Sequence, residues 1–330
     1  MQAPFRKFAL TLAAVWLVLA VSGVVYAGMI DLPAWLAAPV IAAFLWEASF
    51  YLAPGFPALR EAAERRWRPP VLAAGLVASA VAPYLVCTLP TGTFRWGAVF
   101  LLTAVAAAAC FWFLLLPRNG FSDAGFILLM VAVKLFGLFG FIYPTVAPKV
   151  PLEILGFLMW IRLGVMVILS FRGAEGIGFG FIPTRKDWLT GTREFLLFLP
   201  IGLPLALAIG FVRYRPMPID WWLWPGAALG TFLGMLWVVA LAEEFLFRGL
   251  LQQRLSLWLG SSLAGCVFAS IAFGLVHLPF RQFPNWRFAL VAGVAGLFYG
   301  RAYSKSGGIR AAMVAHALMN TCTQMFFTRI

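Results

Sequence analysis

Residues 98–116 read AVFLLTAVAAAACFWFLLL, a stretch without a single charged residue. Arg95 and Arg118 lie just outside its two ends. As an α-helix this stretch would rise about 28 Å at 1.5 Å per residue, close to the roughly 30 Å of hydrocarbon in a bilayer. The run is continuous, so it lacks the alternation of a half-buried strand. It therefore predicts a helix that crosses a membrane.

Similar apolar runs continue through the whole chain. They occupy residues 8–28, 32–52, 71–89, 98–116, 126–143, 152–171, 195–212, 222–251, 262–278, 288–303 and 309–327. Hydrophobic residues make up 63% of the sequence and charged residues 11%, whereas soluble domains carry roughly 25% charged residues. In lipid, only helices and closed barrels satisfy every backbone polar group. We expect an all-α, polytopic transmembrane helical bundle with about 10–11 spans.

The chain has a net charge of +13, and most of its positive residues lie in the loops between these runs. Lys and Arg occur singly or in small groups there, without the basic stripe of a nucleic-acid-binding face, so no nucleic-acid partner is expected. With the N-terminus in the cytoplasm and eleven alternating spans, most of the 25 Lys and Arg residues fall on the cytoplasmic side. The predicted protein is a multi-pass membrane protein with a cytoplasmic N-terminus, in the plasma (inner) membrane if bacterial.

Residues 172–194 form the best domain boundary in the sequence. Gly176, Gly178 and Gly180 are followed there by charged residues and Trp188, a pattern that indicates an interfacial linker. The glycine spacing is not GxGxxG and no parallel-sheet unit surrounds it, so a nucleotide loop is not expected. The linker would separate a six-span N-terminal membrane region, residues 1–171, from residues 195–330.

Ionisable residues inside apolar spans are costly and are candidates for function. They are Glu47, Lys134, Arg162, Glu243, Glu244, His277 and His316, which include both histidines of the chain. For Glu47, Lys134 and Arg162 we expect pairing between helices. The alternative is that these three residues and the pair Glu243 and Glu244 form a proton or ion relay, which would make the protein a coupled transporter or a lipid-handling protein.

The segment LAEEFLFR, residues 241–248, contains two adjacent carboxylates in an apolar run. Glu244 and Arg248 have the i,i+4 spacing with the acid first, which favours an ion pair. Glu243 projects about 100° further round the helix and would face a cavity. A carboxylate in that setting is a candidate general base.

Two further pairs share a helix face at i,i+4 spacing. They are Phe273 with His277, and His316 with Asn320. Together with the acidic segment they give EExxxR, FxxxH and HxxxN in this order. This set resembles the CPBP family of intramembrane proteases, the Abi-like family of type II CAAX prenyl endopeptidases and bacteriocin-processing enzymes. The resemblance covers about residues 225–325 and does not extend to residues 1–171.

The resemblance implies a CAAX-protease-like intramembrane endopeptidase, with residues 195–330 as its catalytic membrane domain and residues 1–171 as an accessory region. Glu243 and His277 would activate water, and His316 and Asn320 would stabilise the oxyanion. Glu244, Arg248 and Phe273 would support the site. The expected partner is a membrane-associated protein or peptide substrate within the lipid bilayer.

Two alternatives remain for this site. Glu243, His277 and His316 are zinc-ligand types, so a metallo-type peptidase is one of them. The sequence lacks HExxH and its histidines lie on different predicted helices, so the glutamic type without a cofactor is favoured. The other alternative is a non-catalytic membrane scaffold that uses the pocket to bind a partner. Arg281, Asn285 and Arg287 follow His277 and form either a solvated rim or a contact for the polar end of a substrate.

Overall fold

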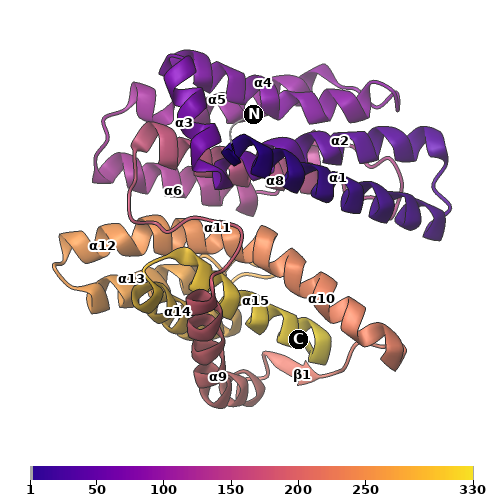
Figure 1. The fold of residues 1–330 in the computed structure, drawn as a ribbon. Helices are drawn as coiled ribbons and strands as arrows, with labels where there is room; N and C mark the ends of the chain where they lie inside the picture. The colour runs from indigo at the N-terminus through magenta and orange to yellow at the C-terminus, as the bar shows by residue number, and fades with distance from the viewer. Residues whose placement is uncertain (1–2, 330) are drawn as a thin grey trace. The chain divides into compact units, whose positions relative to one another are not determined.

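The computed structural model describes residues 3–329 and divides the chain into two compact units, which meet in sequence at Gly173 and Ala174 (Figure 1). Among the described residues, seven helices are long and apolar enough to cross a membrane. They are Pro4–Met29, Ala34–Gly55, Pro69–Thr88, Trp96–Leu115, Glu153–Arg172, Arg185–Ala208 and Trp221–Trp258. The polytopic helical fold predicted from the apolar runs is therefore confirmed.

The other predicted spans form shorter or more polar helices. The run at 126–143 is interrupted at Gly137, which has a left-handed backbone with φ 60°. Helix α13, Ser262–Leu275, has 14 residues and is too short to cross about 30 Å unaided. Helix α14, Trp286–Ser306, is long enough but carries Arg287, Arg301 and Lys305. The apolar runs therefore predict more spans, about 10–11, than the seven helices that are long and apolar enough among the described residues.

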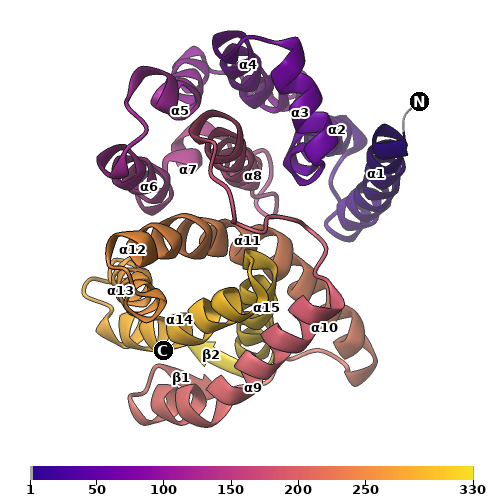
Figure 2. The ribbon, with the colours of Figure 1, turned by 60° about the vertical axis from the view of Figure 1, so that its left-hand side comes forward.

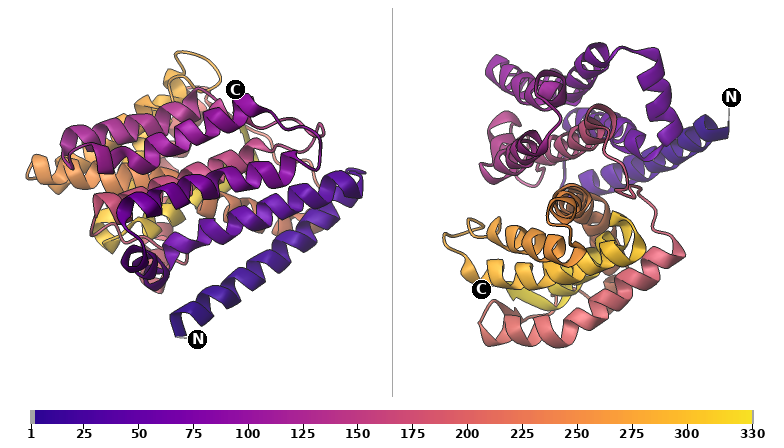
Figure 3. Two further views of the ribbon diagram at one scale, coloured as in Figure 1. Left: turned by 90° about the horizontal axis from the view of Figure 1, so that it is seen from above. Right: turned by 90° about the vertical axis from the view of Figure 1, so that its left-hand side faces the viewer.

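The first unit consists of helices packed against one another. Its elements are α1 Ala3–Met29, α2 Ala34–Leu52, α3 Pro57–Arg66, α4 Pro69–Thr88, α5 Trp96–Leu115, α6 Gly120–Leu135, α7 Leu138–Ile142 and α8 Glu153–Met166. Helix α1 packs on α2, α2 on α4, and α4 on α5, as the view from above shows (Figure 3, left). Helix α8 contacts α2, α4 and α5 and continues as a π-helical segment, Val167–Arg172.

A buried ion pair joins three of these helices. Arg162 of α8 donates to both carboxylate oxygens of Glu47 on α2, at 2.5 and 3.2 Å. It also donates to the hydroxyl and the carbonyl oxygen of Ser79 on α4, both at 2.9 Å. Glu47 is 0% exposed and Arg162 is 1% exposed, so these bonds satisfy charges that water does not reach. The pairing between helices predicted for these two residues is confirmed.

The second unit is built from long helices and one small sheet. Its elements are α9 Arg185–Ala208, β1 Val212–Tyr214, α10 Trp224–Gly234, α11 Leu241–Glu244, α12 Gln253–Trp258, α13 Ser262–Leu275, α14 Trp286–Ser306, α15 Ile309–Phe326 and β2 Phe327–Arg329. Helix α9 contacts α14 and α15, α13 packs on α14, and α14 on α15. Figure 2 shows β1 and β2 side by side near α9. They pair antiparallel, with Val212 opposite Arg329.

Helix α9 begins inside the segment predicted as a linker. The Thr184 hydroxyl accepts from the Asp187 backbone N–H, and the Asp187 carboxylate accepts from the Thr184 N–H, which is a capping box. Residues 185–194 are therefore helical. The buried Glu194 on α9 pairs with Lys305 at 2.6 Å and Arg301 at 3.3 Å on α14. The accessory and catalytic roles of the predicted regions remain predictions.

Gly191 is the position at which α9 and α15 approach most closely through a glycine. A Cβ at Gly191 would lie 2.5 Å from the Ala311 carbonyl oxygen and 2.7 Å from the Val314 Cβ. Gly191→Ala is therefore expected to destabilise the protein by about 1–3 kcal/mol, because neither backbone nor β-branched side chain yields easily. Thermal unfolding in detergent measures this. Gly226→Ala on α10 is the control, because an added Cβ there would meet no atom within 4 Å apart from its own helix backbone and chain neighbours. Equal losses in both variants would contradict the packing.

Candidate functional site

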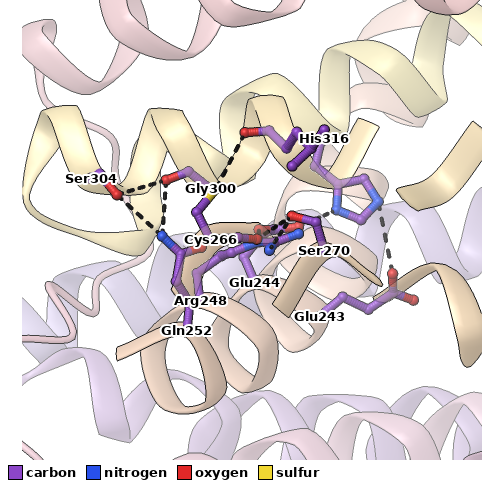
Figure 4. Close-up of polar contacts among 10 residues, drawn as sticks. Glu243, Glu244, Arg248, Gln252, Cys266, Ser270, Gly300, Ser304 and His316 are labelled. Carbon is purple, nitrogen blue, oxygen red and sulfur yellow. Dashed lines mark hydrogen bonds and ion pairs between the residues drawn. The ribbon is translucent and has the colours of Figure 1, made fainter. Parts of the chain in front are cut away.

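The two adjacent glutamates lie in the middle of a continuous helix, Trp221–Trp258, 38 residues long. The four-residue α-helical stretch Leu241–Glu244 is flanked by two π-helical segments, Met235–Ala240 and Phe245–Gln252. π-Helical turns are rare and occur frequently at functional sites, because they change the direction in which side chains project. Here they flank both carboxylates, whose surroundings Figure 4 shows in close-up.

Glu244 is fully buried and holds two partners at once. The Arg248 Nε donates to its Oε2 at 3.1 Å, which is the ion pair predicted from the i,i+4 spacing. The His316 Nδ1 lies 2.7 Å from its other oxygen, Oε1. Glu244 and Arg248 are both 0% exposed, so each charge depends on the other for compensation. The sequence predicts the first contact, whereas the second joins residues 72 positions apart.

Arg248 extends this network toward α13. Its Nη1 lies 3.4 Å from the Ser270 hydroxyl, which donates to the Cys266 carbonyl at 2.7 Å. Its guanidinium lies over the Phe273 ring at 5.3 Å, a cation–π contact. Gln252, one turn further along, donates to the Gly300 carbonyl at 3.1 Å and ties the same helix to α14 (Figure 4). The carboxylate–arginine pair is thus anchored on two neighbouring helices.

His316 of α15 lies between the two glutamates. A carboxylate only accepts, so the Nδ1 that contacts Glu244 carries a proton. The Nε2 then lies 3.9 Å from the Glu243 Oε2. The imidazole ring is stacked on Tyr299, with centroids 4.6 Å apart and planes at 10°. Glu244 and Tyr299 together fix the orientation of this ring, and its Nε2 faces Glu243.

The two carboxylates differ in accessibility. The Glu243 side chain is 15% exposed and the Glu244 side chain is 0% exposed. One water molecule can contact both the Glu243 Oε2 and the His316 Nε2 across 3.9 Å, with hydrogen bonds of about 2.8 Å to each. Glu243 is therefore the more accessible of the two carboxylates, and its role as the reacting group stays a prediction.

His277 lies in the turn after α13, and Phe273 connects it to the rest of the site. The His277 Nδ1 is 2.6 Å from the Phe273 carbonyl oxygen, so this nitrogen carries a proton and the neutral ring has its lone pair on Nε2. The Phe273 ring packs edge-on against His277 at 4.9 Å and against His316 at 5.8 Å. Asn320 lies one turn after His316 on α15 and is partly exposed.

Besides Glu244, Arg248 and Phe273, three residues support this site that sequence patterns did not indicate. Tyr299, Ser270 and Cys266 are ordinary residues of apolar helices, and no spacing to the glutamates identifies them. Their contacts arise from helix packing between segments far apart in the chain. Among residues 3–329, no three His, Cys, Asp or Glu side chains are arranged to hold a metal ion. The Glu243, His277 and His316 set therefore does not fit a zinc site in this arrangement.

Comparison with known proteins identifies the region that contains this site. Residues 225–322 match the family model described as type II CAAX prenyl endopeptidase Rce1-like, and they form a domain of that protease family. The chain is also 32% identical over 83 residues to the uncharacterized protein YpbD of Bacillus subtilis (strain 168). That match covers 25% of this chain and 38% of YpbD. No solved structure matches the chain.

Proposed function

We propose that this Rce1-like domain makes the chain an intramembrane endopeptidase, which hydrolyses a peptide bond in a membrane-associated protein or peptide. The observation that carries the proposal is the position of His316. Its Nδ1 is held by the buried Glu244–Arg248 pair, and its Nε2 faces the accessible Glu243 at 3.9 Å. The seven long apolar helices support a substrate that resides in or at the membrane.

In the proposed reaction, Glu243 acts with His277 to activate water. The Glu243 carboxylate takes a proton from the water, whose oxygen attacks the carbonyl carbon of the scissile peptide bond. The protonated glutamic acid then returns that proton to the leaving amine as the C–N bond breaks. Phe273 would hold His277 in place for this step, because its ring packs against His277 and its carbonyl oxygen lies 2.6 Å from the His277 Nδ1.

His316 and Asn320 are proposed to stabilise the oxyanion of the tetrahedral intermediate. The amide of Asn320 is a donor, and the His316 Nε2 donates when the ring is protonated. Their i,i+4 spacing on α15 directs both toward one side of the helix. Glu244, Arg248 and Tyr299 would act as positioning residues, because they orient His316 without being placed at the scissile bond.

Chelation separates the glutamic type from the zinc-dependent alternative. Dialysis of the purified protein against a strong chelator is expected to leave the cleavage rate unchanged, because proton transfer through Glu243 requires no metal. The rate is measured on one peptide before and after dialysis. A zinc peptidase that is known to lose activity under the same dialysis is the control, because it shows that the chelator removes bound metal. Loss of activity that zinc restores would overturn the glutamic type.

A comparison of protein termini in cells tests the function itself. Membranes from cells that express the wild-type chain are compared with membranes from cells that express Glu243→Gln at equal levels. We expect at least one membrane-protein terminus to depend on the intact carboxylate, and that terminus identifies the substrate. Identical sets of termini would contradict a peptidase and favour the scaffold alternative, which predicts no effect of Glu243→Gln.

A further inference from the structure

Arg329 lies at the edge of the proposed active site because of the small sheet. The strand β2 pairs with β1, and this ladder places Arg329 opposite Val212. The Arg329 guanidinium lies over the Phe288 ring at 4.7 Å and over the Phe211 ring at 6.0 Å. These two aromatic rings are themselves stacked at 5.1 Å. The guanidinium is thus held on an aromatic platform.

The same platform carries His277. The rings of His277 and Phe288 are 4.4 Å apart, so the guanidinium of Arg329 and the imidazole of His277 share one aromatic neighbour. Phe280 packs edge-on against Phe288 at 5.4 Å, and Arg281 lies over the Phe280 ring at 5.9 Å. Two arginines therefore flank the aromatic group that contacts the proposed water-activating histidine.

Charged groups on both sides act on the Arg329 guanidinium. Burial lowers the pKa of the Arg329 guanidinium, and the neighbouring positive charge of Arg281 lowers it further. The negative charge of Glu243 acts in the opposite direction and raises it. The Arg329 guanidinium is thus partly desolvated and lies near the like charge of Arg281. An anion bound between the two guanidinium groups would offset both effects.

We propose that Arg329 and Arg281 bind a carboxylate of the substrate peptide and so select the bond that is cleaved. The proposal rests on the peptidase function and adds a specificity site to it. A planar carboxylate matches the fork of donors on a guanidinium. The aromatic group beside these two arginines also contacts His277. The carboxylate is either the C-terminal group of the substrate or an Asp or Glu side chain.

The test compares one degenerate peptide library in three forms, using the full-length protein in lipid nanodiscs. The first has free C-termini, the second is amidated, and the third is amidated with a fixed Glu near the C-terminus. Amidation is expected to lower kcat/KM by about 10- to 100-fold, because it removes a charge-assisted interaction. Recovery in the third library would assign the site to an acidic side chain, and no recovery would assign it to the C-terminal carboxylate.

Substitutions then locate the effect. Arg329→Gln and Arg281→Gln should each slow the preferred library and reduce the difference between it and its uncharged form. Arg65→Gln on α3 is the control, because Arg65 is 72% exposed and pairs with Glu61 at 3.6 Å. It should leave the preference intact. Arg281 is exposed, so its variant is informative even if Arg329→Gln lowers stability.

The outcomes separate this inference from the function on which it rests. If the wild type cleaves none of the libraries faster than Glu243→Gln does, the peptidase function is wrong. If the wild type cleaves all three libraries at equal rates, the peptidase function stands and the carboxylate site is wrong. Equal slowing of charged and uncharged libraries by Arg329→Gln would also overturn the site, because it would show a role independent of the carboxylate.

Discussion

Glu243→Gln is expected to lower the rate of peptide cleavage by about 100- to 10,000-fold, the range over which general bases contribute. Glutamine preserves the size of the side chain but cannot accept a proton from water. The effect should be on rate rather than on folding, because the Glu243 side chain is 15% exposed and the buried ion pair is formed by Glu244 and Arg248. Initial rates for both proteins in the same nanodiscs measure it.

Two further variants define that result. Glu61→Gln on α3 removes a carboxylate that is 52% exposed and should leave cleavage unchanged. Glu244→Gln should lower stability as well as activity, since it removes the partner of both Arg248 and His316. A Glu243→Gln protein that unfolds like the wild type and cleaves at the wild-type rate would contradict the assignment of the base.

Arg248→Met is expected to lower the free energy of unfolding by about 3–5 kcal/mol. The substitution leaves the Glu244 carboxylate charged and buried, with 0% exposure and without its cation. It also removes the contacts of Arg248 with Ser270 and Phe273, which connect the helix to α13. Chemical unfolding in mild detergent, followed by tryptophan fluorescence, measures the change.

A double substitution separates the loss of the pair from the loss of packing. Glu244→Gln combined with Arg248→Met removes both charges and should be less destabilising than Arg248→Met alone. Arg65→Met on α3 is the exposed control, because Arg65 is 72% exposed and pairs with Glu61 at 3.6 Å. We expect a change of about 0.5 kcal/mol or less there. Equal losses for Arg65→Met and Arg248→Met would contradict a buried pair.

Local spacing explains which parts of the site the sequence predicts. Glu244 and Arg248 are one helical turn apart, so their ion pair follows from helix geometry. The contact between Glu244 and His316 depends on how α15 packs beside the long helix, and no local rule specifies it. The i,i+4 spacing predicts Arg248 as the partner of Glu244, whereas in the structure Glu244 also contacts His316. Tyr299 was not anticipated for the same reason.

In the fold, too, the sequence predicts what depends on local residues and does not predict contacts between distant segments. Long apolar runs such as residues 98–116 predict helices, because lipid leaves the backbone few alternatives. The small sheet has no such signal. Its strands contain three residues each and pair across more than a hundred positions, from Val212 to Arg329. The sheet nevertheless positions Arg329 beside Phe288, which contacts His277, so the position of Arg329 could not be predicted from the sequence.

We propose that the site around Glu243 hydrolyses peptide bonds. To test this, the peptide library is digested in water enriched in oxygen-18, and the products are analysed by mass spectrometry. Wild-type protein should generate new C-termini that carry one oxygen-18 atom from the attacking water, and the Glu243→Gln protein should generate almost none. Labelled products that form equally with both proteins, or no labelled products with the wild type, would contradict the claim.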